Sequence, residues 1–431
     1  MLNDAERALV SRDPMLPGLA TLLDETVLTD VLRQQGPFLS LKRVSVTYIR
    51  YKPKTSCVVG LTLCIADEAP YFCFARALTR SRFVSYCSRL ISEGKNTGCW
   101  PETPVLLNEL AAFVSSPLLD RRLCLAALYN DRKYTALLQN TRDSVTGGQS
   151  RERWHFLRYK PGRRCVIGVY RDERPFAVIR CAAEKEFFRQ LRGSQVGASL
   201  AHIELLGVNE TDRLIATRWI AGKSLDYFLH GDPDCLSLVT LTGKSLARIH
   251  HVPYFLPEKQ TCQGALRQLW QEHGMVAALY PQLAERFSHC ILRLEALSEW
   301  LNHEQVLLHG DFSADQVIVS EDRRRVNIID WDRCVYGHPA GDPGCFIART
   351  EMDVINGELT AAQAGAIRDA LLAGYKMERK ISDFDIRWYT AKALMCLVVE
   401  PFRKRDVYWP EKAELLLNRV EDICVSAVFI S

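Results

Sequence analysis

Residues 309–316 read H-G-D-F-S-A-D-Q, and a second acidic stretch, I-I-D-W-D, follows at residues 328–332. Each stretch comes directly after aliphatic residues that are typical of a short buried strand. We therefore expect three short strands, V-L-L, V-I-V and V-N-I-I, to bring Asp311 and Asp330 to one cavity. Two carboxylates so close repel each other unless a cation or a proton compensates. A divalent metal with a polyphosphate would supply that compensation.

A repeated hairpin precedes this region. Residues 48–63 read Y-I-R-Y-K-P-K-T-S-C-V-V-G-L-T-L, and residues 156–171 read F-L-R-Y-K-P-G-R-R-C-V-I-G-V-Y-R, with seven of sixteen positions identical. In each copy a β-rich run meets Lys-Pro and small or polar residues before a second β-rich run. This pattern is typical of a β-hairpin.

The similarity continues beyond the hairpins. A third β-rich run follows each copy, carries Arg76 or Arg180 near its end, and leads into a helical segment. Two more strands are expected within residues 104–118 and 202–225, so the repeated unit is three strands, a helix and two strands. After about residue 226 the pattern becomes mostly helical. Apolar residues recur at helical spacing in the runs 238–251, 263–301, 360–380 and 385–425.

Composition sets the class of protein. The 431 residues are 48% hydrophobic and 25% charged, which predicts two or three globular units. The net charge of +4 is too weak to indicate a nucleic-acid or membrane partner. There is no long apolar run of the kind found in membrane spans or secretory signals. Fifteen scattered cysteines without a C-x-x-C pair favour neither zinc nor a disulfide framework, so we expect a reduced, cytoplasmic protein.

The acidic stretches resemble a known family. His309-Gly-Asp311, Gln316 and Asp330 are similar to the catalytic loop and metal site of the aminoglycoside phosphotransferase and choline kinase-like group, small-molecule relatives of the protein kinases. In that group an Asp deprotonates the acceptor hydroxyl, an Asn five residues later binds Mg²⁺, and a second Asp binds Mg²⁺ after a short hairpin. The resemblance covers about residues 145–400. It implies an α+β, protein-kinase-like fold with an antiparallel β N-lobe and a mainly helical C-lobe.

The resemblance also implies a role for each residue of the loop. Asp311 would be catalytic, Gln316 and Asp330 would hold Mg²⁺, and His309 and Asp342 would support the loop. Gln316 stands where the group has Asn, and its amide oxygen is carried on a longer arm. A catalytically weak or inactive nucleotide-binding or scaffolding protein (a pseudokinase) therefore stays open as the alternative.

The same resemblance assigns ATP to the second hairpin and the strands that follow it. The K-P-G-R-R turn would cover the phosphates, and Gly162 would let the backbone approach them. Arg180 replaces the usual strand-three lysine, and Glu186 is preferred to Glu184 as its partner. The run L-I-A-T-R-W-I-A-G would be the hinge that reads adenine. The candidate nucleotide-binding residues are Lys160, Gly162, Arg163, Arg164, Arg180, Glu186, Arg218, Trp219 and Ile220.

These patterns predict three domains. Residues 1–140 would form a degenerate N-lobe-like repeat, residues 141–222 the nucleotide-binding N-lobe, and residues 223–431 the helical C-lobe with the catalytic loop. We expect an ATP- and Mg²⁺-dependent phosphotransferase that acts on a hydroxyl of a small molecule. The repeat would be structural, or would contact a protein partner or the acceptor.

The nature of the acceptor is only partly constrained. The chain has no D-F-G or A-P-E segment, which disfavours a kinase that acts on proteins. The helical regions also lack the strongly acidic pattern that a polycationic aminoglycoside acceptor would require. The identity of the acceptor, and the choice between ATP and GTP, are left open.

Overall fold

The computed structural model describes residues 1–65, 70–94, 99–138, 152–201, 203–254, 256 and 258–428. It divides into two compact units. The first consists of Met1–Phe187, Leu206–Thr217 and Phe402–Trp409, and the second of Phe188–Leu205, Arg218–Pro401 and Pro410–Ser431. The predicted domain boundary between residues 140 and 141 lies outside the described residues.

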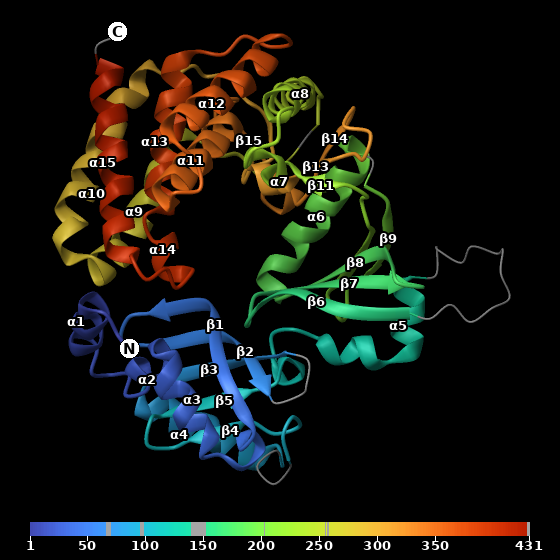
Figure 1. Cartoon of the computed structure of the whole chain (residues 1–431), viewed down its shortest axis with the longest axis vertical. Helices are drawn as coiled ribbons and strands as arrows, with labels where there is room; N and C mark the ends of the chain where they lie inside the picture. Colours follow the sequence, from blue (N-terminus) through green and yellow to red (C-terminus); the bar gives the residue numbers. More distant parts are fainter. Residues whose placement is uncertain are drawn as a thin grey trace, which may run out of the picture. The chain divides into compact units, whose positions relative to one another are not determined.

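The first unit begins with three helices that the hydrophobic pattern did not reveal (Figure 1). These are α1 (Asp4–Arg12), α2 (Leu19–Leu23) and α3 (Glu25–Arg33). What marks α1 and α3 in the sequence is the residue that caps the N-terminus of each helix. Asn3 and Glu6 form a capping box at the start of α1. The carboxylate of Asp24 accepts hydrogen bonds from the N–H groups of Thr26 and Val27 at the start of α3.

A five-stranded sheet follows these helices. Its strands are β1 (Leu41–Lys52), β2 (Ser56–Ile65), β3 (Tyr71–Leu78), β4 (Val105–Leu107) and β5 (Ala112–Ser115). They are antiparallel and stand in the order β1-β2-β3-β5-β4, while α4 (Arg80–Ser92) joins β3 to the later pair. This is the predicted succession of three strands, a helix and two strands.

The second sheet has the same order. Its strands are β6 (Glu152–Lys160), β7 (Arg164–Arg171), β8 (Arg174–Ala182), β9 (Leu205–Asn209) and β10 (Leu214–Arg218), arranged β6-β7-β8-β10-β9. Helix α6 (Glu184–Leu200) again follows the third strand. Between the two sheets the chain forms the short helical turns η2 (Pro117–Leu119) and η3 (Leu125–Tyr129) and the helix α5 (Asp131–Leu137).

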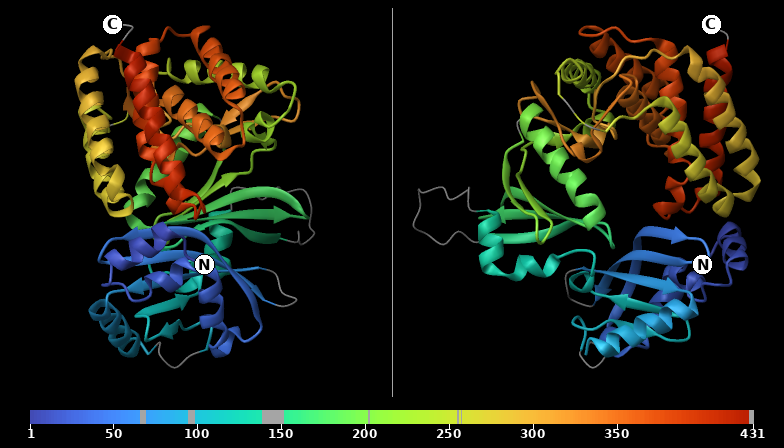
Figure 2. Two further views of the ribbon diagram at one scale, coloured as in Figure 1. Left: turned by 60° about the vertical axis from the view of Figure 1, so that its left-hand side comes forward. Right: turned by 180° about the vertical axis from the view of Figure 1, so that it is seen from behind.

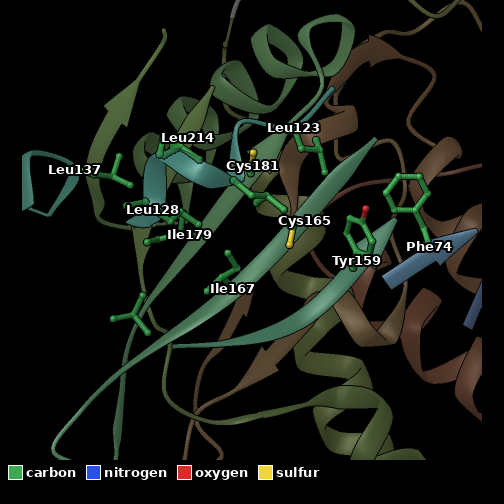
Figure 3. Close-up of a cluster of buried hydrophobic side chains, with 14 of the residues drawn as sticks. Phe74, Leu123, Leu128, Leu137, Tyr159, Cys165, Ile167, Ile179, Cys181 and Leu214 are labelled. Carbon is green, nitrogen blue, oxygen red and sulfur yellow. The ribbon is translucent and has the colours of Figure 1, made fainter. Parts of the chain in front are cut away.

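One hydrophobic core includes side chains from both sheets (Figure 3). Phe74 of the first sheet contacts Tyr159 of the second with ring centroids 6.3 Å apart, and the cluster continues through Cys165 and Ile179. Leu128 of η3 and Leu137 of α5 complete it. Burial raises the pKa of the Cys181 thiol to about 12, so this cysteine acts as a small apolar core residue.

The second unit is mainly helical. Its helices are α7 (Leu225–Leu229), α8 (Cys235–Ile249), α9 (Cys262–Leu279), α10 (Ala284–Leu297), α11 (Gly341–Asn356), α12 (Ala361–Lys376), α13 (Asp383–Leu397), α14 (Glu400–Arg403) and α15 (Trp409–Val428), the last two shared with the first unit. Helix α12 packs on α8 and α11 on α13. Helix α15 lies beside α10, where Glu421 pairs with Arg286 (Figures 1 and 2). No helix within the described part of the chain is long and apolar enough to span a membrane.

Two small sheets carry the acidic stretches. Strands β11 (Lys223–Ser224), β13 (Val317–Val319) and β14 (Val326–Ile328) form one, and β12 (Val306–Leu308) with β15 (Val335–Gly337) forms the other. The three short strands were predicted correctly, and the structure divides them between two sheets. Strand β12 pairs with β15, which the sequence analysis missed, because Asp330 turns the chain back toward β12. Antiparallel sheets with a mainly helical remainder confirm the α+β class.

Candidate active site

The turn after β12 presents Asp311. Gly310 has φ of +82°, and a Cβ at this position would lie 2.1 Å from the carbonyl oxygen of Arg333. Glycine alone tolerates both the positive φ and this close approach. The Asp311 side chain, which follows the turn, is 34% exposed and can meet a ligand from solvent.

A buried carboxylate holds this turn from behind. Asp342, in the first turn of α11, accepts hydrogen bonds from the backbone N–H of His309 at 2.7 Å and of Gly310 at 2.8 Å. His250 Nε2 donates to the same carboxylate at 3.1 Å, and the Tyr375 hydroxyl bonds His250 Nδ1 at 2.7 Å. Burial alone would raise the pKa of Asp342, but these hydrogen bonds hold it below its usual value. Asp342 is therefore a charged support for the loop.

The side chain of His309 ties the loop to the second acidic stretch. Its Nε2 donates to the carbonyl oxygen of Ile329 at 2.8 Å, and its ring packs on Trp331 with centroids 5.0 Å apart. The N–H of Ile329 in turn donates to the backbone carbonyl of Gln316 at 2.8 Å. The backbone of Ile329 is thus hydrogen-bonded to both the His309 side chain and Gln316, and Ile329 is the residue directly before Asp330.

Gln316 and Asp330 supply oxygen donors at this junction. Gln316 donates its amide N–H to the carboxylate of Asp315 at 3.1 Å, which leaves the amide oxygen as an acceptor. Asp330 has a left-handed backbone, with φ of 61° and ψ of 52°. A non-glycine residue held in this conformation is common at functional sites. An amide oxygen and a carboxylate are ligands that suit Mg²⁺, which takes few protein ligands and completes its shell with phosphates and water. The described residues contain no cluster of three His, Cys, Asp or Glu side chains able to hold a metal by itself.

Two arginines that the sequence analysis did not single out approach Asp311. Arg333 Nε lies 3.5 Å from one carboxylate oxygen, and Arg349 Nη2 lies 3.9 Å from the other. Arg349 also pairs with Glu400 at 2.6 Å. Although burial alone would lower it, the pKa of Arg349 is raised by its acidic neighbours. Arg333 directly follows the second acidic stretch and Arg349 lies in α11, and no local pattern pairs either of them with Asp311.

The turn predicted to cover the phosphates belongs to the first unit and is held by protein contacts. The N–H of Gly162 donates to the buried Asp120 carboxylate at 2.5 Å, and the Tyr159 hydroxyl donates to the same oxygen at 3.0 Å. Arg163 Nε donates to Glu186 at 2.8 Å. The N–H of Gly162, predicted to approach the phosphates, is thus already hydrogen-bonded to Asp120. Glu186, predicted to pair with Arg180, accepts a hydrogen bond from Arg163.

The remaining candidate residues lie on the expected elements. Arg180 is in β8, and its cross-strand partner is Val166 of β7. Arg218 ends β10 and forms an ion pair with Glu204 at 2.8 Å. Lys160 and Arg164 flank the turn between β6 and β7, and Trp219 and Ile220 follow β10.

Residues 144–384, more than half of the chain, match the model of a family described as "APH: Phosphotransferase enzyme family". No curated protein sequence matched the chain.

Several solved structures are similar. A choline/ethanolamine kinase family protein from Mesorhizobium loti has 12% identity, covers 70% of this chain and 100% of its own, and has a TM-score of 0.48. Choline kinase from Cryptosporidium parvum has 8% identity, covers 67% of this chain and 94% of its own, and has a TM-score of 0.49. An aminoglycoside phosphotransferase from Streptomyces rimosus has 14% identity, covers 61% of this chain and 96% of its own, and has a TM-score of 0.43.

Proposed function

This chain belongs to the phosphotransferase enzyme family, and we propose that it uses ATP and Mg²⁺ to phosphorylate a hydroxyl group of a small molecule. The observation that carries the proposal is the fixed catalytic loop. Asp342 holds the backbone of His309 and Gly310, and the His309 side chain holds Ile329 beside Asp330. One rigid framework therefore supports both the candidate base and a candidate metal ligand.

Asp311 has the role of general base. It orients the acceptor hydroxyl and accepts its proton as the oxygen attacks the γ-phosphate. Partial exposure keeps the carboxylate accessible. The hydrogen bonds from Asp342 end on the backbone before Asp311, so they do not occupy its carboxylate oxygens. Positioning of this kind supplies much of the catalysis in phosphoryl transfer.

Gln316 and Asp330 would hold Mg²⁺, which neutralises charge on the phosphates during transfer. Within the first unit, Lys160, Arg163, Arg164 and Arg180 offer cations for a triphosphate. The hinge roles of Arg218, Trp219 and Ile220 and the pairing of Arg180 with Glu186 are further parts of the proposal.

The charge beside Asp311 narrows the acceptor. Arg333 and Arg349 both approach the Asp311 carboxylate, and Arg349 also pairs with Glu400, so these acidic side chains already have cationic partners and offer little net negative charge to a polycationic acceptor. This arrangement disfavours an aminoglycoside and favours a neutral or anionic hydroxylated molecule. A turnover screen that compares polyols and hydroxy acids with choline and kanamycin tests this preference. Highest turnover with kanamycin would contradict it.

The variant Asp311→Asn tests the catalytic assignment. We expect phosphotransfer to fall about 10²- to 10⁴-fold, the usual contribution of a positioned base, while Mg-ATP binds as in the wild type. Asp322→Asn, an exposed carboxylate in the turn after β13, is the control and should keep full turnover. Wild-type turnover by Asp311→Asn would show that another group is the base.

A non-catalytic nucleotide-binding protein is the second candidate. The observation that favours it is Gln316, whose longer side chain already donates to Asp315 at the predicted metal position. Mg-ATP binding measured by thermal shift, together with no turnover across the acceptor screen, would support this second function over the first.

A further inference from the structure

Three arginine side chains converge in the first unit, which does not contain the catalytic loop. The position of Gly162 marks the point where they meet. A Cβ atom placed on Gly162 would lie 3.2 Å from Arg50 Nη2, 3.3 Å from Arg122 Cδ and 3.8 Å from Arg76 Nη2. Arg50 comes from β1, Arg76 from β3 and Arg122 from the segment after η2. Three cations around one point form a basic cluster, defined here as Arg50, Arg76 and Arg122.

Strand register explains why two of them meet. Arg50 and Arg76 are the cross-strand partners of Val58 on its two sides, so they stand in one row on the same face of the first sheet. In the second sheet Arg158 and Arg180 flank Val166 in the same way. Arg180, which the family resemblance assigns to the nucleotide phosphates, therefore has a counterpart in Arg76 of the first sheet.

The protein does not neutralise this cluster. Among the charged neighbours with the largest effects within the described residues, Asp120 is the carboxylate that acts on both Arg50 and Arg76, and Arg163 adds a further positive charge beside Arg50. Its oxygens already accept hydrogen bonds from the Tyr159 hydroxyl and from the N–H groups of Gly162 and Arg122. One carboxylate balances at most one of three guanidinium charges, so two positive charges remain.

One buried donor of this cluster also lacks a hydrogen bond among the described residues. Arg76 Nε is buried and has no hydrogen-bond partner among the described residues, and its guanidinium lies 5.9 Å from the centroid of the Phe113 ring. Burial, and after it the neighbouring guanidinium groups, lowers the pKa of Arg76. A buried cation without a partner is costly, whereas an anion that accepts from several guanidinium groups makes strong charge-assisted bonds. Arg122 is exposed, so the cluster is reached from solvent.

We propose that Arg50, Arg76 and Arg122 form a second anion site, which binds a phosphate group of a small phosphorylated molecule or a polyphosphate. Phosphate fits better than a carboxylate, because it carries up to two charges and enough oxygens for three planar donors. The three arginines lie beside the K-P-G-R-R turn but come from outside it, whereas Asp311 belongs to the second unit. Anion binding by the cluster does not depend on phosphotransfer activity. It gives the first sheet a ligand-binding role.

The test is binding of inorganic pyrophosphate to the full chain, measured by calorimetry at constant ionic strength without Mg²⁺. The variants are Arg50→Gln and Arg76→Gln, and the control is Arg82→Gln, an exposed arginine of α4. All are made in an Arg180→Gln background, which removes the corresponding arginine of the second sheet. We expect Arg50→Gln and Arg76→Gln each to weaken binding about tenfold or more, and Arg82→Gln to leave it unchanged.

A second measurement separates ligand binding from a structural role. Without an anion, Arg76→Gln should melt at or above the temperature of its parent, because it removes a repelled and poorly bonded charge. Pyrophosphate should raise the melting temperature of the parent and not that of Arg76→Gln. Parallel titrations with ATP and glucose 6-phosphate then distinguish a polyphosphate ligand from a phosphate monoester.

Two results would overturn the proposal. One is pyrophosphate binding that is equal in the parent and in both variants, or absent from all of them. The other is a lower melting temperature for both variants without any anion, since the protein itself would then satisfy these charges.

Discussion

Gln316 is the residue at which the candidate metal site departs from the family pattern. Its amide N–H group donates to Asp315, so the amide oxygen is the atom left to bind a cation. Gln316 ends the short turn η7 (Ala314–Gln316), and its backbone carbonyl accepts a hydrogen bond from the N–H of Ile329. The longer side chain thus starts from a rigid backbone.

Substitution of Gln316 tests this arrangement. In Gln316→Ala the Mg²⁺ concentration needed for nucleotide binding should rise at least about tenfold, because loss of even an outer-shell partner of a metal weakens binding by that much. Mg²⁺ titration of a fluorescent ATP analogue provides the measurement. Ser320→Ala, at the end of β13, is the control. An unchanged Mg²⁺ requirement would remove Gln316 from the metal site.

Asp342 gives a prediction about pH. The hydrogen bonds from His309, Gly310 and His250 place its folded pKa below the unfolded value of about 3.9. Its contribution to stability is therefore present above that pH and is lost as the pH falls through the folded pKa. Asp342→Asn should lose about 3 kcal/mol at pH 7, because the amide NH₂ cannot accept the bonds of the carboxylate.

Melting curves from pH 7 to pH 3 check this result. The difference in melting temperature between wild type and Asp342→Asn should be largest at neutral pH and should narrow below about pH 4. A difference that stays constant over this range would mean that Asp342 supports the loop by shape and not by charge.

The candidate loop residues could be predicted from sequence because they are local. His309, Asp311 and Gln316 lie in one short stretch, and their spacing carries the pattern. Arg333 and Arg349 could not be predicted, since their approach to Asp311 depends on where β15 and α11 pack. The same limit applies to Arg50 and Arg76, which meet only through strand register.

At the scale of elements, the two K-P turns share one stabilising device. In the first hairpin Asp13 accepts from the Tyr51 hydroxyl at 2.7 Å and from the N–H of Lys54 at 2.8 Å, and Lys54 has φ of 56°. Asp120 makes the equivalent bonds to Tyr159 and Gly162 in the second hairpin. Each turn thus keeps its left-handed residue because a carboxylate from another segment accepts its N–H.

Asp13→Ala should destabilise the first unit by about 2–3 kcal/mol, because the buried Tyr51 hydroxyl and the Lys54 N–H both lose their acceptor. Urea unfolding followed by tryptophan fluorescence measures the loss. Asp4→Ala, at an exposed carboxylate of α1, should leave the unfolding midpoint nearly unchanged. Equal midpoints for Asp13→Ala and wild type would show that the turn holds without this acceptor.

The sequence predicted these hairpins because alternating apolar residues and Lys-Pro are local signals. It missed α11, since the helix begins with G-D-P-G, which reads as a loop. Proline is tolerated in the first helical turn, where its missing N–H has no intrahelical partner. This start places the Asp342 carboxylate in the first turn of α11, where it reaches the backbone of His309 and Gly310.

At the scale of the whole chain, a late segment returns to the first unit. Residues Phe402–Trp409 belong to the same compact unit as the N-terminal helices. Phe402 packs against Tyr51 with ring centroids 6.3 Å apart, and Asn3 donates to the carbonyl oxygen of Val407 at 3.2 Å. The first unit is therefore completed by residues from near the other end of the sequence, which no local pattern could predict.

Arg405 holds the segment 402–409 to the N-terminal helices through an ion pair and a hydrogen bond. Its guanidinium pairs with Glu6 and donates to the carbonyl oxygen of Leu23. Glu6 is buried, with 3% of its surface exposed, so it depends on this cation. Arg405→Ala should destabilise the first unit by about 3–5 kcal/mol, the usual cost of leaving a buried charge unpaired. Arg7→Ala, which breaks the exposed pair with Asp4, should change little.

The double variant Glu6→Gln with Arg405→Ala separates charge pairing from packing. Because it removes the carboxylate that needs a partner, it should be more stable than Arg405→Ala alone. The loss of stability in the double variant minus the losses in the two single variants gives the coupling energy of the pair. Thermal unfolding of the full chain measures all four proteins in one buffer. If the double variant were as unstable as Arg405→Ala, the return of residues 402–409 would depend on the packing of Phe402 and its neighbours and not on the buried ion pair.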